Sequence, residues 1–229
     1  MNLASLFSGG KDSSFSIYKA KQEGHKIQCL ITILPFSEES HLLHFPNVEI
    51  TKLQSKAMRI PQIYIKSKSD EIKSEETLLD EILKKAKDDY NLEGLAHGGI
   101  LSNFQKNIFE KACSKLNLKL ISPLWHKEPS EYMNNLLESN FHFIITSVSS
   151  DGLDESWLGK EITLDDLPKL EQLAKKFGFN MNFEGGEAET LVINCPLFSH
   201  PIKILKSRKF WDGIRGRFEI LDAELEKHA

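Results

Sequence analysis

A short segment near the start of the chain combines two glycines, a lysine and an aspartate in a spacing that can bind an anion. The run SGGKDS, residues 8–13, follows the apolar residues 3–7 and precedes a helical pattern. This order predicts a strand, a tight loop and a helix N-terminus. Glycines let the backbone approach a ligand closely, and the unpaired N–H groups of a first helical turn point toward an anion. We therefore expect an anion site of phosphate size here.

The spacing distinguishes this loop from two commoner phosphate-binding loops, the Walker A loop and the G-x-G-x-x-G fingerprint, and it matches neither. It resembles instead the PP-loop of the ATP pyrophosphatases, which split ATP between the α and β phosphates and activate a carboxylate or carbonyl as its adenylate. In such a loop the amides and Lys11 would stabilise the pyrophosphate leaving group, and Asp12 would hold Mg²⁺. A glycine turn with a solvated lysine is the structural alternative.

A second cluster of unusual composition occurs in the C-terminal half. Residues 184–190, EGGEAET, place two adjacent glycines among three acids and a threonine. This composition favours neither a helix nor a strand interior, so it indicates a binding turn. A solvated acidic loop is the alternative interpretation.

The elements that would position the first cluster alternate between strands and helices. This alternation predicts an α/β fold, a parallel sheet with helices on both faces, whose ligand lies at the carboxyl ends of the strands. The expected strands are residues 3–7, 26–34, 63–65, 94–97 and 118–121, and the expected helices are 14–23, 47–58, 71–90 and 102–116.

The pattern becomes less regular after Pro123. Helices are expected at residues 128–139 and 165–177, strands at 142–148 and 191–193, then a β-like basic tail and a closing helix around Ala223 and Leu225. This change predicts an ATP-binding domain of residues 1–123 and a smaller α+β substrate domain of residues 124–229.

The composition is that of an ordinary soluble protein, with 40% hydrophobic and 27% charged residues. No apolar stretch approaches the length of a membrane span, and the N-terminus enters a strand directly, so we expect a cytoplasmic protein with no membrane partner. Cys29, Cys113 and Cys195 are far apart, which suits a reducing compartment and provides no metal-ligand spacing.

The charge distribution has one local feature. The net charge of −4 argues against a protein whose main function is to bind the phosphate backbone of a nucleic acid. Residues 203–218, however, contain six basic residues and one acid, with Phe210, Trp211 and Phe218 among them. This segment is either the charged outer face of C-terminal strands or a docking patch for an acidic macromolecule.

Taken together, these motifs resemble the diphthine–ammonia ligase family of PP-loop enzymes along essentially the whole chain. The resemblance implies ATP-dependent amidation of diphthine, the modified histidine of translation elongation factor 2, with AMP and pyrophosphate as products. Two positions depart from the pattern: Gly99 stands where an aspartate is expected, and Ala188 where an aromatic residue is usual. The matching segments are residues 8–13, 44–47, 98–100 with Gln105, 123–125, 152–154, 157–159, 184–187 and 189–190.

The resemblance also implies roles for individual residues. Lys11, Asp12, Glu187 and Glu189 are the expected catalytic residues, with either glutamate able to take a proton from ammonium. Asp12 is the expected Mg²⁺ ligand, and ATP and Mg²⁺ are the expected cofactors. The nucleotide-binding residues are Ser8, Gly9, Gly10, Lys11, Asp12, Ser13, His44, Gly98 and Gly99.

The substrate-binding residues follow from the quaternary ammonium of diphthine, which needs an aromatic face or an acid. For each tryptophan, packing in the core is the competing interpretation, because large aromatic side chains are mostly buried. The expected set is Trp125, Asp154, Glu155, Trp157, Glu184, Gly185, Gly186, Glu187 and Thr190.

Two other functions remain open. One is a PP-loop enzyme that modifies tRNA by thiolation or lysine ligation. The cysteines provide no C-x-x-C pair for sulfur transfer, which argues against thiolation, whereas lysine ligation stays possible if the basic segment of residues 203–218 holds RNA. We expect tRNA to be an unlikely partner. The other is an ATP-binding protein without catalysis. Since the resemblance leaves no segment for a glutaminase, the expected nitrogen donor is free ammonium, or ammonia delivered by a separate protein.

Overall fold

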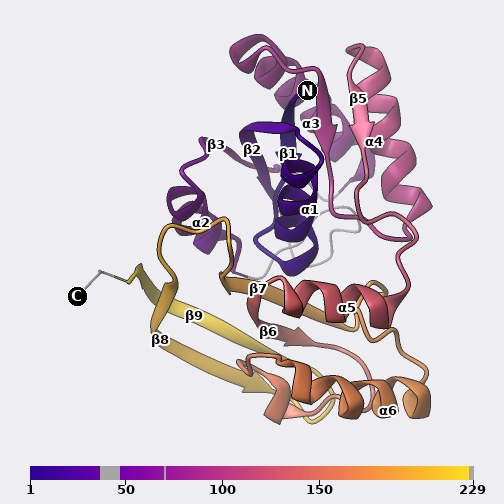
Figure 1. The fold of residues 1–229 in the computed structure, drawn as a ribbon, viewed down its shortest axis with the longest axis vertical. Helices are drawn as coiled ribbons and strands as arrows, with labels where there is room; N and C mark the ends of the chain where they lie inside the picture. The colour runs from indigo at the N-terminus through magenta and orange to yellow at the C-terminus, as the bar shows by residue number, and fades with distance from the viewer. Residues whose placement is uncertain (37–46, 70, 227–229) are drawn as a thin grey trace.

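A computed structural model describes residues 1–36, 47–69 and 71–226. The first half of the chain forms a five-stranded sheet in which every neighbouring pair is parallel, with strand order β3-β2-β1-β4-β5 (Figure 1). The predicted parallel sheet is therefore confirmed. Its strands are β1 (Asn2–Leu6), β2 (Lys26–Leu34), β3 (Gln62–Lys66), β4 (Gly94–Ala96) and β5 (Lys119–Ile121).

Helices cover both faces of this sheet, as predicted. Alternate residues of a strand point to opposite faces. Ile31 accordingly packs in one apolar cluster with residues of α3 and α4, and its neighbour Leu30 in another with residues of α1 and α2. The helices are α1 (Lys11–Gln22), α2 (Thr51–Met58) with the short η1 (Val48–Ile50) before it, α3 (Ile72–Tyr90) and α4 (Asn103–Lys115).

The second half forms a four-stranded antiparallel sheet of order β7-β6-β9-β8, which lies below the first sheet in Figure 1. Helices α5 and α6 contribute to the apolar core of this half. The elements are α5 (Pro129–Glu138), β6 (His142–Val148), η2 (Glu155–Trp157), η3 (Leu164–Asp166), α6 (Leu167–Phe177), β7 (Ala188–Asn194), β8 (Ile202–Trp211) and β9 (Gly216–Leu225).

The predicted closing helix around Ala223 and Leu225 is wrong, because these residues belong to β9 and pair with Ile204 and Ile202 of β8. The reversal between the strands explains the difference. Asp212 accepts hydrogen bonds from the backbone N–H groups of two of the next three residues and fixes a tight turn, which returns the chain alongside β8. Pairing with β8 therefore makes this segment a strand, although the spacing of its apolar residues alone is compatible with a helix or a strand.

The two halves share a packed interface through α1. Phe15 of α1 belongs to the core of the second half, and its ring lies 5.8 Å from that of Tyr132 and 5.1 Å from that of Phe141. Helix α1 thus contacts the parallel sheet and also packs against α5. The division of the chain between residues 123 and 124 stays a prediction.

Two further expectations concern the whole chain. Cys29, Cys113 and Cys195 are free and buried, and burial raises the pKa of each thiol to about 12. They therefore behave as small core residues. Among the described residues, no helix has the length and apolar character needed to cross a membrane.

Candidate nucleotide-binding site

A cavity of about 1220 Å³ lies at the carboxyl edge of the parallel sheet. Strand β1 has β2 on one side and β4 on the other, so the chain leaves β1 and β4 in opposite directions along the sheet. Open α/β sheets bind their ligands at such a point, beyond the carboxyl ends of the strands. The loop after β1 and the turn after β4 both line the cavity. The second half supplies the opposite wall from β6, from the acidic turn (residues 184–190) and from the tip of the β8–β9 hairpin.

The PP-loop (residues 8–13) is ordered by its own side chains. Gly9 has a φ of +83°, a left-handed conformation that glycine adopts without strain. The Ser13 hydroxyl accepts a hydrogen bond from the Ser8 amide at 3.3 Å and donates to the Gly10 carbonyl at 3.2 Å. Gly10, the N-cap residue of α1, has no side chain that could cap the first turn, which suits a helix N-terminus that binds an anion.

The second half of the chain also holds this loop in place. The Val192 amide donates to the Gly9 carbonyl at 3.0 Å, and the Gln54 side-chain amide bridges the carbonyls of Gly9 and Val192 at 2.8 Å each. The Thr190 hydroxyl accepts a hydrogen bond from the Lys11 amide at 3.2 Å. Strand β7 and helix α2 therefore fix the PP-loop from two sides. Thr190 contacts the loop directly and also lines the cavity.

Lys11 and Asp12 form an ion pair inside the cavity wall. The Lys11 Nζ lies 2.9 Å from each Asp12 carboxylate oxygen, although Lys11 is only 1% exposed. The Tyr132 hydroxyl donates to Asp12 Oδ1 at 2.5 Å, and the rings of Tyr132 and Phe183 lie 5.8 and 5.6 Å from the ammonium. Burial raises the pKa of Tyr132 well above its usual value, and the Asp12 charge adds to this, so Tyr132 stays a donor.

Tyr132→Phe should therefore lower the free energy of unfolding by about 1.5 kcal/mol, because it removes one hydrogen bond to a charged carboxylate and nothing else. Urea denaturation of the variant and the parent chain measures this difference. Tyr18→Phe is the matched control, since Tyr18 stacks on the same Phe15 ring but its hydroxyl bonds to no described residue. Equal losses in the free energy of unfolding for the two variants would show that the hydrogen bond from Tyr132 to Asp12 does not stabilise the fold.

The turn after β4 approaches the PP-loop closely at Gly98. A Cβ atom at Gly98 would lie 2.6 Å from the backbone of Asp12 and Ser13. The turn is fixed by His97, whose Nδ1 accepts a hydrogen bond from the Gly99 amide at 3.1 Å. Its Nε2 therefore carries the proton and donates to the Ser122 hydroxyl at 2.6 Å. The role of His97 could not be predicted from the sequence, because nothing in its immediate sequence marks it as more than a strand end.

His97 makes stability depend on pH. Burial, with a smaller effect of the Lys106 charge, lowers its pKa from 6.5 to about 4. Between these values the unfolded chain binds a proton that the folded chain does not, so stability is fully present above pH 6.5 and falls as the pH drops toward 4.

We expect this loss to be on the order of 3 kcal/mol, since one pKa unit corresponds to 1.36 kcal/mol. Urea unfolding of the parent and of His97→Asn between pH 7.5 and 4.5 measures it, because the variant should lack this part of the pH dependence. His126→Asn, at an exposed histidine, should keep it. The same pH dependence of the free energy of unfolding in His97→Asn and the parent would show that His97 is not the group responsible.

The glutamates of the acidic turn have different surroundings. Glu184 Oε1 accepts hydrogen bonds from the amides of Ile100 and Leu101 at 3.0 Å each, and so ties the turn to the first half. Burial, reinforced by the charge of Asp12, raises the pKa of Glu184.

Glu187 is directed toward the backbone of its own loop. Its carboxylate accepts from the amides of Asn180 and Gly185 at 2.8 Å each, and its side chain does not line the cavity. Glu189, in contrast, lines the cavity together with Gly185 and Gly186. Of the two glutamates expected to act as the base, Glu189 is therefore the one that the structure places at the cavity.

Besides Glu187, four expected substrate residues lie away from the cavity. Trp157 is 2% exposed and packs in the core of the second half, and Asp154 accepts a hydrogen bond from the Ser156 amide at 2.9 Å as the cap of η2. Glu155 is exposed in η2. Trp125 stacks on His126, with Lys106 Nζ 4.3 Å from its ring centre. His44 lies outside the described residues, so its expected contact with the nucleotide stays a prediction.

The cavity has an aromatic wall from the hairpin, which sequence analysis noted only as a basic segment with aromatic residues. Phe210, Trp211 and Phe218 all line the cavity. The Asn47 side chain holds this wall, because its amide donates to the Phe218 carbonyl at 3.0 Å and accepts from the Ile220 amide at 2.9 Å. The local sequence of Asn47 suggests only a helix cap and does not reveal this contact.

The parallel sheet, its loop and the cavity at its switch point define a nucleotide-binding α/β protein of the PP-loop class. Comparison with family models adds the family. The model of the diphthamide synthase N-terminal domain matches residues 1–120, and that of the C-terminal domain matches residues 128–225. The chain belongs to the diphthamide synthase family. The resemblance, the fold class and the assignment to a family of ligases are thereby confirmed.

Two relatives and one solved structure illustrate the range of similarity. The human protein named diphthine–ammonia ligase is 32% identical over 225 residues, covering 88% of this chain and 82% of the relative. The rat protein of the same name is 32% identical over 227 residues, covering 89% and 83%. A predicted subunit of tRNA methyltransferase from Methanocaldococcus jannaschii is 18% identical with a TM-score of 0.46, covering 86% of this chain and 98% of that one.

Proposed function

We propose that this chain uses ATP to amidate the carboxylate of diphthine on translation elongation factor 2 with ammonium, giving diphthamide, AMP and pyrophosphate. The observation that carries the proposal is the PP-loop, with Lys11 and Asp12, in a cavity whose opposite wall comes from the second half of the chain. The family supports the proposal, because its curated relatives are named diphthine–ammonia ligase.

The lining of the cavity suggests where each reactant binds. The adenine ring would lie against four apolar residues of the cavity lining, which are Ile31, Ile33, Leu79 and Phe109. The phosphates would lie at the PP-loop and the N-terminus of α1. The diphthine side chain would then enter from the hairpin side.

The aromatic wall offers a place for the quaternary ammonium of diphthine. Phe210 has the guanidinium groups of Arg208 and Arg217 4.6 and 5.1 Å from its ring centre, which would repel a second cation. Trp211 and Phe218 are therefore the better rings, and Glu189 lines the same cavity. This assignment replaces the expected Trp125 and Trp157, which the structure places elsewhere.

The proposed chemistry has two steps. A carboxylate oxygen of diphthine attacks the α-phosphorus of ATP, the bond from that phosphorus to the bridging oxygen breaks, and pyrophosphate leaves. Ammonia then attacks the acyl carbon of the adenylate, and AMP leaves with the former carboxylate oxygen. Lys11 and the loop amides would stabilise the charge on pyrophosphate, and Glu189 would take the proton that ammonium must lose.

The residues present fit Mg²⁺ that binds together with ATP. Among the described residues, no group of three or more His, Cys, Asp or Glu side chains could hold a metal by itself. Magnesium in nucleotide sites is commonly held by one or two carboxylates and the substrate phosphates. Asp12 would provide such a carboxylate at the loop, and the ion would neutralise phosphate charge when bound.

The products of ATP turnover test this proposal. With elongation factor 2 carrying diphthine, ammonium and Mg²⁺, the chain should form AMP and pyrophosphate, and omission of either the acceptor or ammonium should reduce the rate of amide formation to background. Formation of ADP and phosphate, or ATP binding without turnover, would overturn it. AMP formation that requires tRNA instead of the protein acceptor would assign the chain to the tRNA-modifying class.

A further inference from the structure

The β8–β9 hairpin exposes an unusual share of apolar side chains. Of the nine large hydrophobic residues that are exposed in the described part of the chain, four belong to this hairpin: Leu205, Phe210, Ile214 and Leu221. Leu205 and Leu221 fall at the irregularities of the ladder, where the paired positions skip from Ile204 to Lys206 and from Asp222 to Ile220. Exposed apolar side chains gathered on one element indicate an interaction surface.

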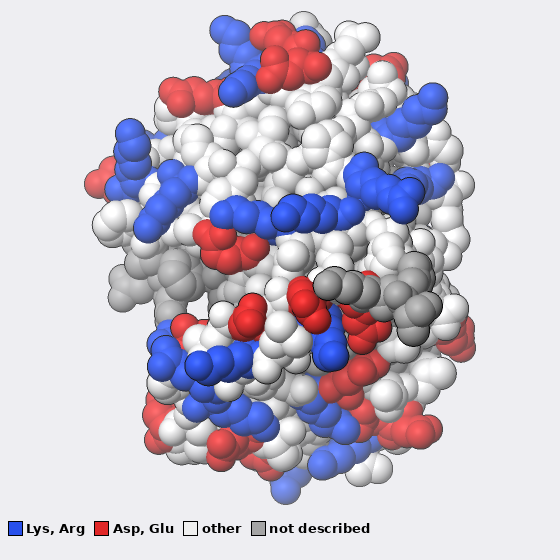
Figure 2. Space-filling view, turned by 90° about the vertical axis from the view of Figure 1, so that its left-hand side faces the viewer, with Lys and Arg blue, Asp and Glu red and all other residues white. Residues whose placement is uncertain are grey.

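The hairpin also carries more positive than negative charge, because residues 202–225 contain six basic residues and four acids, of which Asp222 and Glu224 lie opposite Lys206 and Lys203 in the ladder. Glu219 is paired with Arg208 at 2.6 Å, and Asp212 is used by the turn between the strands. Figure 2, which looks onto the side of the molecule where the hairpin lies, shows several lysine and arginine side chains on the lower part of this face, with acidic side chains among them. Four basic residues of the hairpin form no ion pair with another described residue: Lys203, Lys206, Lys209 and Arg215.

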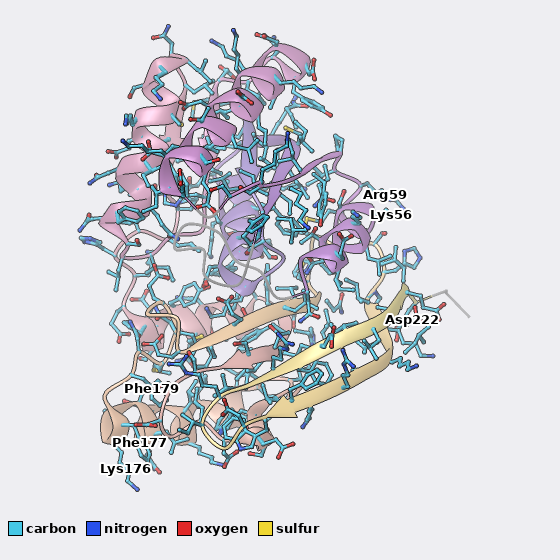
Figure 3. All side chains as sticks on the ribbon, turned by 180° about the vertical axis from the view of Figure 1, so that it is seen from behind. Lys56, Arg59, Lys176, Phe177, Phe179 and Asp222 are labelled. Carbon is cyan, nitrogen blue, oxygen red and sulfur yellow. The ribbon has the colours of Figure 1, made fainter. Side chains whose placement is uncertain are left out.

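This surface is continuous with the cavity. The tip of the hairpin lines the cavity, whereas its open end lies beside α2, as Asp222, Lys56 and Arg59 show in Figure 3. Lys56 and Arg59 are exposed, so α2 extends the basic surface beyond the hairpin. A macromolecule that places one side chain in the cavity from this side would therefore lie along the hairpin.

The residue types favour a protein over a nucleic acid. Leu205, Ile214 and Leu221 are aliphatic, so they cannot stack on bases as aromatic side chains do. Asp222 and Glu224 are exposed on β9, so the hairpin carries charges of both signs and is not the uniformly basic track that a phosphate backbone favours. A protein face can match such a mixture, with its acids opposite the lysines and its other residues opposite β9. A protein surface with acids around an apolar centre matches this mixture.

We propose that the β8–β9 hairpin is the docking surface for an acidic face of the protein whose carboxylate is amidated. The proposal rests on the proposed function, because it takes the acceptor to be a folded protein. Basic residues of the hairpin attract the acidic face, and the exposed apolar residues pack against it.

Charge reversal at two positions outside the cavity tests this surface. Lys206→Glu/Lys209→Glu should raise the KM for elongation factor 2 carrying diphthine, and the Kd of their complex, at least about tenfold, while kcat and the KM for ATP stay unchanged. The difference should shrink at high salt. The matched control is Lys84→Glu/Lys85→Glu on α3, which makes the same change in net charge at two exposed lysines outside the hairpin.

The outcomes separate the two proposals. Equal KM and Kd in the two double variants would overturn the docking surface, even with a fully active parent chain. Loss of tRNA binding without loss of acceptor binding would also overturn it, in favour of an RNA surface. If the parent chain forms no amide, the proposed function fails, and the direct Kd measurement still decides whether the hairpin binds the acceptor.

Discussion

Replacement of Lys11 by methionine should lower kcat/KM for ATP-dependent AMP formation by about 100- to 1000-fold, the usual effect of losing one preorganised charged donor. Lys11 is held in the cavity wall by Asp12 and by the rings of Tyr132 and Phe183. Methionine keeps most of the length and apolar stem and removes the ammonium. Quantification of AMP from a defined amount of acceptor measures the effect.

The control for this variant is Lys19→Met on the same helix. Lys19 lies over the rings of Phe15 and Tyr18 and does not line the cavity, so its loss should leave kcat/KM unchanged. Urea unfolding of both variants shows whether each chain is folded. Full activity in folded Lys11→Met would contradict the role given to this lysine.

The second large effect is expected for Gly98→Ala. The new Cβ would lie 2.6 to 2.7 Å from three backbone atoms of Asp12 and Ser13, so the PP-loop or the turn must move. We expect a loss of about 1–3 kcal/mol in the free energy of unfolding, as in other overpacked sites. The Kd for ATP should rise at least about tenfold, because small displacements of a preorganised site are costly.

Gly178→Ala provides the matched control. Gly178 has a φ of +77°, but a Cβ there would meet nothing within 4 Å. Its replacement should cost about 1–2 kcal/mol from backbone strain alone and leave ATP binding unchanged. Isothermal titration with ATP compares the two variants. Equal ATP affinity for both would show that the close approach at Gly98 does not position the loop.

The parts of the site that follow from sequence are local ones. The PP-loop is contiguous with a strand and a helix, so its backbone geometry is set by neighbours in the chain, and Gly9 takes the positive φ that such a loop needs. The parallel sheet follows from the same strand and helix alternation. Ser102 caps α4 by accepting from the Gln105 amide at 3.3 Å, at the residue where the predicted helix begins.

The remaining parts depend on contacts between distant residues. Tyr132 donates to Asp12 across 120 positions of the chain, and no local pattern marks it. Trp157 is an aromatic residue in a matching segment, but a large ring serves equally well in the core, where the structure places it. Glu187 and Glu189 are two residues apart, and only the folded turn shows which one lines the cavity.

The most direct test of the proposed function joins the two products in one experiment. The chain is incubated with ATP, Mg²⁺, isotopically labelled ammonium and elongation factor 2 carrying diphthine, and AMP is measured together with the mass of the modified peptide. The account predicts one AMP for each carboxylate converted to a labelled amide. ATP consumption without the label in the peptide, or an amide formed without AMP, would contradict it.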